Sequence, residues 1–169
     1  NYSIQKTITF DEPGSLGSVG IPQYTYAYDP SSHTLFVGGT HVVLAIDTNT
    51  DTIKKVIYLK DVSKAIGFEG LQWWEMTSGN AVGLLYNPNE NYLYIAHLDR
   101  SFVSVYDLSN NRFLPQIISL KGFFPHYNIF ANDDYSKLYT LIFRSDSVSV
   151  IDVKSKTVEK VIDLHAYLQ

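Results

Sequence analysis

The chain has 169 residues, of which 45% are apolar and 18% are charged, which is typical of a packed globular domain and excludes a disordered chain. Its formal net charge is −4 and no block of like charges is present, which argues against nucleic-acid binding. Cysteine is absent, which excludes disulfides, thiolate metal sites and cysteine nucleophiles together.

Two further features bear on membrane insertion and on processing of the chain. No segment approaches the roughly 18 consecutive apolar residues of a membrane-spanning helix, so no membrane span is expected. The sequence starts at Asn1 and not at Met, so we expect a processed chain or a piece of a longer protein.

The first predicted element is a strand over residues 4–10, whose pattern matches that of a later strand at 53–59. Three repeats follow, each made of four short strands joined by polar turns. The repeats span residues 22–59, 80–120 and 125–164, and an inserted loop over 60–79 separates the first two.

Within each repeat, a turn rich in Asp, Asn, Pro and Ser separates the first two strands, as a hairpin requires. The matching segments are 28–37, 86–95 and 131–140. The third strands are apolar and end on Asp47, Asp107 and Asp152. A polar turn then leads to a fourth strand, at 53–59, 114–120 and 158–164.

Four short strands in about 40 to 50 residues predict one blade of a β-propeller. The predicted fold is therefore all-β, with three blades of four antiparallel strands after a leading outer strand. Propellers need about four blades or more to close, and an open stack leaves an apolar face at each end. The expected partners are the remaining blades of the same protein or a second copy. The leading strand favours the first, because it resembles the end of a preceding blade.

The repeat resembles the YVTN family of β-propeller repeats, which is found in surface-layer proteins and secreted propellers. Pro22 and Pro125 match the proline that opens the family's first strand, whereas the middle blade has Asn80 there. The second strands match at 35–37, 93–95 and 138–140, and the third strands match at 45–47, 105–107 and 150–152. The resemblance implies a propeller but leaves the function open, because related propellers include adhesive modules and enzymes.

Propeller geometry, taken by analogy with the family, sorts the connections onto two rims. We call the rim with the second-to-third-strand turns and the connections between blades the loop rim, and the other the turn rim. Charged and imidazole side chains are expected on the loop rim: His41, His97, Asp99, Arg100, His126, Arg144 and Asp146.

Two interpretations of these residues remain open. In one they form a channel-mouth centre, with His41, His97, His126 and Asp146 as metal ligands and with His97, His126 and Asp99 as catalytic groups. In the other they are ordinary polar turn residues, with Arg100 near Asp99 and Arg144 near Asp146 as solvated pairs. No compact metal-binding spacing such as HExxH supports the first.

Aromatic residues on the same rim offer a different chemistry. Trp73 and Trp74 in the inserted loop could stack on sugar rings or anchor a protein partner, or could instead cap the blade core. The preferred prediction is a non-enzymatic extracellular or cell-surface module that binds protein or glycan and needs no cofactor. Its expected ligand-binding residues are Trp73, Trp74, His41, Arg100 and Arg144. The alternative is a lactonase-like hydrolase with a metal ion.

Overall fold

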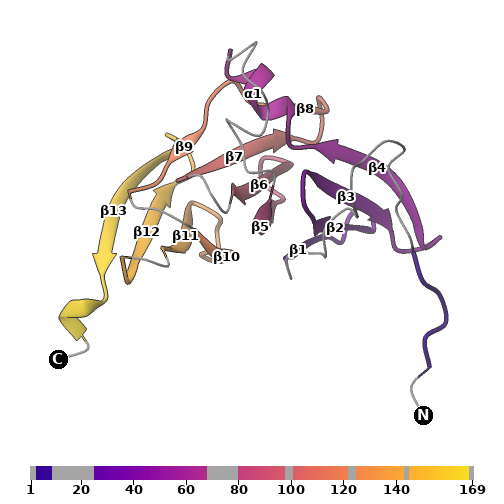
Figure 1. Cartoon of the computed structure of the whole chain (residues 1–169), viewed down its shortest axis with the longest axis horizontal. Coiled ribbons are helices and arrows are strands. Elements are labelled where there is room, and N and C mark those ends of the chain that lie inside the picture. Colours follow the sequence, from indigo (N-terminus) through magenta and orange to yellow (C-terminus); the bar gives the residue numbers. More distant parts are fainter. Residues whose placement is uncertain are drawn as a thin grey trace.

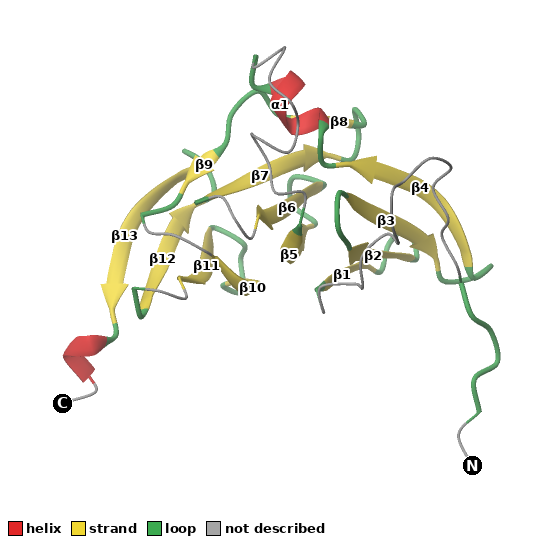
Figure 2. Cartoon of the chain, in the orientation of Figure 1, coloured by secondary structure: helices red, strands yellow, loops and turns green. Residues whose placement is uncertain are grey.

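The computed structural model describes residues 3–8, 25–67, 80–97, 101–121, 125–142 and 145–167, with backbone alone for 125–127 and 167. The predicted all-β class is confirmed, because the strands form three antiparallel sheets (Figure 2). Two short helices accompany them, α1 (Asp61–Ala65) and the 3-10 helix η1 (His165–Tyr167). Within the described ranges, no helix is long and apolar enough to cross a membrane.

The first sheet, blade 1, contains β1 (Tyr26–Asp29), β2 (Thr34–Gly38), β3 (Val42–Asp47) and β4 (Thr52–Tyr58), paired in that order. Blade 2 contains β5 (Ala81–Asn87), β6 (Tyr92–His97), β7 (Phe102–Asp107), β8 (Arg112–Phe113) and β9 (Ile118–Ser119). Blade 3 contains β10 (Pro125–Ala131), β11 (Lys137–Ile142), β12 (Ser147–Asp152) and β13 (Thr157–Asp163).

The three blades lie side by side in an arc (Figure 1). Strands β1, β5 and β10 gather on the inner side of the arc, and β4, β8, β9 and β13 follow its outer side. The two termini lie at opposite ends of the arc. This is the arrangement of propeller blades around a centre, seen for part of a ring.

The fourth strand of blade 2 is interrupted, in contrast to the continuous strand predicted over 114–120. β8 pairs with β7 through Phe113 and Tyr106, and β9 pairs with β7 further along through Ile118 and Val103. Pro115 lies between β8 and β9 and has no N–H to donate to the ladder. The outer strand therefore divides around the proline.

The predicted leading strand over 4–10 falls partly on described residues. Residues 3–8 have no regular secondary structure, and Lys6 Nζ donates a hydrogen bond to the carbonyl of Thr50 in blade 1, at 3.1 Å. The strands with which an outer strand of a preceding blade would pair are not in this sequence. The assignment of 4–10 to such a blade therefore stays a prediction.

The core lies between the blades, because each sheet has apolar residues on both of its faces. One buried cluster joins blades 1 and 2, and includes Phe36, Val43, Leu93 and Ile95. A second cluster joins blades 2 and 3, and includes Tyr94, Val103, Leu138 and Ile151. The alternation along β6 explains this division, since Leu93 and Ile95 point to one neighbour while Tyr94 points to the other.

The turns between third and fourth strands have the same construction in all three blades. The aspartate that ends the third strand accepts a backbone N–H three residues later, at 3.2 Å for Asp47, 3.0 Å for Asp107 and 2.6 Å for Asp152. The residue before each fourth strand has a positive φ: Asp51, Asn111 and Lys156. The aspartates noted in the sequence are thus the residues that close these turns.

Candidate functional site

The loop rim is built by turns whose backbone is the same in each blade. The leucine directly after each fourth strand donates its N–H to the carbonyl of the residue before the third strand. These pairs are Leu59 to His41 at 2.9 Å, Leu120 to Ser101 at 2.7 Å and Leu164 to Asp146 at 2.8 Å. His41 and Asp146 therefore occupy equivalent positions on blades 1 and 3, and both have a positive φ. Both are exposed.

Asp146 pairs with a histidine that the sequence analysis did not single out. Its Oδ2 lies 3.2 Å from Nε2 of His165 in helix η1, which follows the fourth strand of the same blade. The side chains are 56% and 65% exposed respectively, so water competes for both groups. Such a contact contributes little to stability.

His97 has a different environment from the other rim candidates. It is fully buried at the end of β6, where its Nε2 lies 2.8 Å from Ser104 Oγ and its ring lies 4.6 Å from that of Phe102. Burial lowers the pKa of His97 to about 3, so the imidazole is neutral at physiological pH. Its Nδ1 has no hydrogen-bond partner among the described residues. The structure therefore uses His97 as a packed core residue beside Ser104.

The other candidates can be located only in part. His126 belongs to β10, but its side chain lies outside the described residues. The remaining candidates lie outside them altogether: Trp73, Trp74, Asp99, Arg100 and Arg144. Across the described ranges, no group of three or more His, Asp or Glu side chains could hold a metal ion. The metal-centre interpretation stays a hypothesis.

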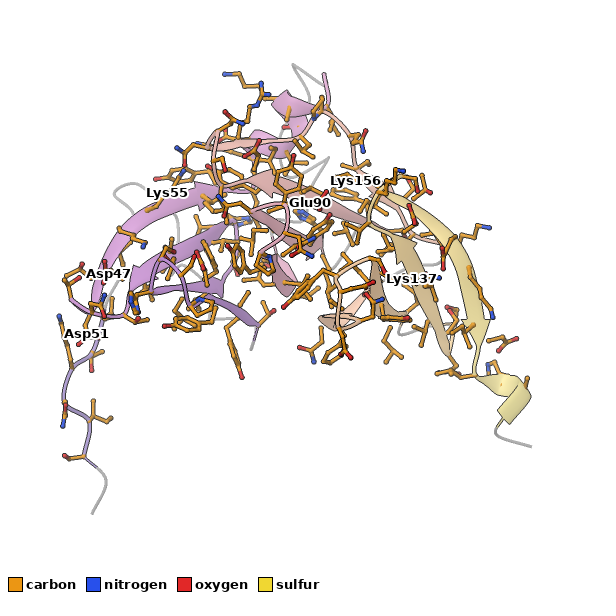
Figure 3. The ribbon with its side chains drawn as sticks, turned by 180° about the vertical axis from the view of Figure 1, so that it is seen from behind. Asp47, Asp51, Lys55, Glu90, Lys137 and Lys156 are labelled. Carbon is orange, nitrogen blue, oxygen red and sulfur yellow. The ribbon has the colours of Figure 1, made fainter. Side chains whose placement is uncertain are left out.

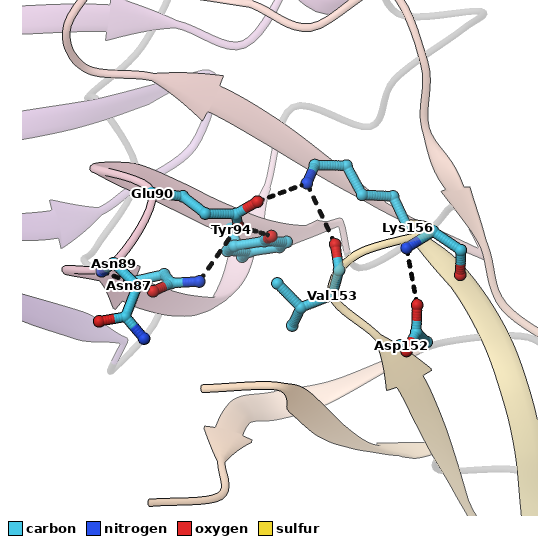
Figure 4. A network of polar contacts seen from close by, with 8 residues as sticks. Asn87, Asn89, Glu90, Tyr94, Asp152, Val153 and Lys156 are labelled. Atoms are coloured by element: carbon cyan, nitrogen blue, oxygen red, sulfur yellow. Dashed lines mark hydrogen bonds and ion pairs between the residues drawn. The ribbon is translucent and has the colours of Figure 1, made fainter. Parts of the chain in front are cut away.

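The turn rim holds a polar network that the sequence analysis did not identify (Figure 4). Glu90 accepts hydrogen bonds at Oε2 from Tyr94 Oη, at 2.6 Å, and from Asn87 Nδ2, at 3.1 Å. Its Oε1 lies 2.8 Å from Lys156 Nζ, which also donates to the carbonyl of Val153 at 3.1 Å. Glu90 comes from the β5–β6 turn and Lys156 from the β12–β13 turn, so the network joins blades 2 and 3.

Burial explains how this network is held. The Tyr94 side chain is fully buried, and burial together with its hydrogen bond to Glu90 raises the pKa of its hydroxyl, which therefore stays a donor. The Lys156 side chain is only 10% exposed, and its Nζ also lies 5.2 Å from the centre of the Tyr92 ring. All of these contacts fix the orientation of one blade against the next, which is a structural role.

The junction between blades 1 and 2 uses a lysine in a similar way. Lys55 on β4 donates a hydrogen bond to Asn111 Oδ1 in the β7–β8 turn, and its Nζ lies 5.0 Å from the centre of the Tyr106 ring. Asn111 occupies the same turn position in blade 2 that Lys156 occupies in blade 3. This turn position carries an interblade polar contact at both junctions.

The two faces at the ends of the arc are apolar and exposed. On blade 1, Tyr26 is 72% exposed and Tyr28 is 45% exposed. On blade 3, Phe130 is 62% exposed and Leu141 is 41% exposed. Exposed apolar residues on one face of a sheet mark a surface that is covered in the complete assembly.

Comparison with known proteins supports the same conclusion about the fold. No family model and no curated protein sequence matches the chain. Among solved structures, it is similar to Kuenenia stuttgartiensis hydrazine synthase, with a TM-score of 0.66 and 17% identity over 91% of this chain and 39% of that one.

Two further solved structures match over most of this chain. Dihydro-heme d1 dehydrogenase NirN gives a TM-score of 0.60 at 13% identity, over 82% of this chain and 28% of that one. Myxococcus xanthus glutaminyl cyclase gives 0.54 at 15% identity, over 84% of this chain and 53% of that one.

All three neighbours are β-propeller proteins, and this chain spans only 28% to 53% of their lengths. At such low identity the likeness concerns the fold alone. The chain is therefore part of a β-propeller, and a partial propeller implies further blades or copies.

Proposed function

We propose that the chain is a propeller module of the YVTN type that acts at the cell surface or outside the cell. It binds protein or glycan through the loop rim and catalyses no reaction. Trp73, Trp74, Arg100 and Arg144 supply aromatic and cationic contacts, and His41 adds an exposed imidazole.

The environment of His97 is the observation that carries this proposal. A catalytic or metal-binding histidine needs a nitrogen that reaches substrate or ion. His97 is fully buried, with Nε2 directed to Ser104 and with Nδ1 enclosed without a hydrogen-bond partner among the described residues. His41 and Asp146 belong to blades 1 and 3, and blade 2 lies between those blades (Figure 1). Exposed residues spread over several blades suit a broad contact surface better than a compact reaction centre.

The proposal is tested by binding of the full chain to a panel of immobilised oligosaccharides. We expect at least one glycan to bind, and the double variant Trp73→Ala/Trp74→Ala to weaken that binding by about tenfold or more, because stacked indole rings contribute much of such interfaces. Lys64→Ala, at an exposed position on helix α1, is the matched control and should bind as the unchanged chain does.

A parallel assay tests the hydrolase alternative. The chain is incubated with a lactone in the presence of Ca²⁺ or Zn²⁺, and ring opening is followed by proton release. We expect no rate above that of the metal alone. Lactone hydrolysis that depends on the chain and disappears in His41→Ala would contradict the proposal.

A further inference from the structure

The two exposed end faces of the arc correspond to the two opposite sides of a junction between blades. Strand pairing gives the correspondence, because Tyr26 pairs with Val37 as Leu84 pairs with Ile95 and as Ile129 pairs with Thr140. Tyr26 is 72% exposed, whereas Leu84 and Ile129 are 5% and 4% exposed, since each packs against the preceding blade. The outer face of blade 1 is thus the type of face that receives a preceding blade.

The outer face of blade 3 is the opposite type. Phe130 pairs with Tyr139 as Ala27 pairs with Phe36, and Leu141 pairs with Val148 as Ala96 pairs with Val103. Ala27 and Ala96 are buried against the following blade, whereas Phe130 and Leu141 are exposed. The face of blade 3 therefore has the form that packs onto the face of blade 1.

Both end faces present large apolar or aromatic side chains. Blade 3 presents the large side chains of Phe130, Tyr139 and Leu141, and blade 1 presents Tyr26, Tyr28 and residues of intermediate exposure such as Val37. Together they provide an apolar surface of the kind that the two internal junctions bury.

Charged residues on blades 1 and 3 provide a second, independent argument that the two end faces fit each other. At the junction of blades 1 and 2, Lys55 reaches Asn111, which has a positive φ at the end of its turn. Lys160 pairs with Val150 in blade 3 as Lys55 pairs with Ala45 in blade 1, so it occupies the position of Lys55.

Asp51 occupies the turn position of Asn111 and of Lys156 in blade 1, where it lies at the outer end of β4 beside Asp47 (Figure 3). Lys160 and Asp51 are both exposed in the single chain. If blade 3 packs onto blade 1, an ammonium group comes to a carboxylate at the very position where both internal junctions have a polar contact.

We propose that two copies of this chain associate head to tail, with blade 3 of each copy packed onto blade 1 of the other. Each copy supplies a three-bladed arc, and a two-fold axis through the centre relates the two identical junctions in a closed ring. Lys160 of one copy pairs with Asp51 of the other. Phe130 pairs with Tyr139 as Ala27 pairs with Phe36 and as Leu85 pairs with Tyr94, so it occupies the position of Ala27 and Leu85 at this junction.

The test measures the mass of the full chain in solution by sedimentation velocity over a range of concentrations. We expect a dimer for the unchanged chain. Asp51→Lys and Lys160→Glu each place like charges at both junctions, so each should raise the dimer dissociation constant by about tenfold. Lys64→Glu, an equally exposed charge change on helix α1, should have no effect.

Mixing the two charge variants gives the decisive result. In a ring of one Asp51→Lys chain and one Lys160→Glu chain, each junction again has one positive and one negative group. We therefore expect the mixture to regain the affinity of the unchanged chain, although neither variant does so alone. Recovery depends on the head-to-tail contact and cannot come from a general change in folding.

Two results would overturn the proposal. A monomer at all concentrations means that other blades of a longer polypeptide, or another partner, cover the end faces. A dimer whose affinity is unchanged in both charge variants and is not restored by mixing means that the copies associate through another surface. Either result leaves the glycan-binding proposal untouched, since that is measured by Trp73 and Trp74.

Discussion

Glu90 and Lys156 join two blades through one ion pair, with 2.8 Å between Glu90 Oε1 and Lys156 Nζ. The pair is well shielded from water on the lysine side and is extended by the hydroxyl of Tyr94. Propeller blades have no covalent contact with their neighbours other than the chain connection, so such contacts set how one sheet is oriented on the next.

Lys156→Met should lower the free energy of unfolding by about 1–3 kcal/mol, because Glu90 loses its cation in a partly buried site while the apolar volume is kept. Urea denaturation at fixed protein concentration measures this. Lys137→Met is the matched control, since Lys137 pairs with Glu159 with 42% and 33% of the side chains exposed. That exposed pair should contribute about 0–1 kcal/mol. Equal losses in the two variants would contradict a special role for the blade 2–blade 3 network.

His97 should make the folded state sensitive to acid. Its pKa is about 3 in the folded chain, against 6.5 for an unperturbed histidine, so over this interval the unfolded chain binds a proton that the folded chain does not. Stability is therefore fully present above pH 6.5 and is lost as the pH falls toward 3. Urea midpoints measured across this range should decline.

The contribution of His97 is isolated by the double variant His97→Phe/Ser104→Ala, which removes the imidazole without leaving the Ser104 hydroxyl buried and unpaired. Its stability should change less with pH over the same interval. An unchanged pH profile would show that His97 is accessible to protons in the folded chain.

A side chain at Gly38 should destabilise the fold. A Cβ atom at this position would lie 2.5 Å from Thr25 Cγ2 and 3.0 Å from the carbonyl oxygen of Ala81, which belongs to the next blade. Gly38→Ala should therefore destabilise the fold by about 1–3 kcal/mol through overpacking. Gly83→Ala is the comparison, because its nearest contacts are 3.2 Å, to Ala96 Cβ and Ile129 Cγ1. Thermal unfolding should show the larger loss for Gly38.

Asp107 should stabilise the fold through the hydrogen bonds that its carboxylate oxygens accept. Its oxygens accept from the side chain of Asn110 at 2.8 Å and from the backbone N–H of Asn110 at 3.0 Å, and these bonds lower the pKa of the carboxyl below 3.8. Asp107→Ala should cost about 1–2 kcal/mol at neutral pH, and Asp107→Asn should cost less, because an amide oxygen still accepts. The difference is read from urea midpoints.

These hydrogen bonds of Asp107 also make the folding stability depend on pH, and this dependence is distinct from that of His97. A carboxyl with a lowered pKa adds stability above its unfolded pKa, and this stability is lost as the pH falls through the folded pKa. The loss for Asp107 therefore begins near pH 3.8 and continues below it. A loss confined to higher pH in the unchanged chain would contradict this assignment.

Much of the fold could be predicted from the sequence because the repeat is local. The turn that closes on Asp47 recurs at Asp107 and Asp152, and an aspartate that accepts backbone N–H groups two or three residues later needs only neighbouring residues. The break in the fourth strand of blade 2 differs from the predicted continuous strand, although Pro115 is a local signal for it.

The candidate site was less predictable because burial decides the chemistry of a histidine. His97 is the last residue of β6 and His41 lies directly before β3, so both are near the loop rim, yet His41 is exposed and His97 is enclosed by Phe102 and Ser104. The pairing of β6 with β7 brings Phe102 and Ser104 to His97. Likewise, Glu90 and Lys156 are separated by 66 residues, and only the packing of two blades brings them together.

The sequence alone determined the four-stranded repeating unit of this protein, since strand alternation and turn chemistry act over a few residues and repeat three times along the chain. The tertiary structure decided which of the apolar faces are covered and which remain open at Tyr26 and Phe130. It also decided which polar groups meet between blades. Coverage is a property of neighbouring sheets, and it is set by contacts between residues far apart in the chain.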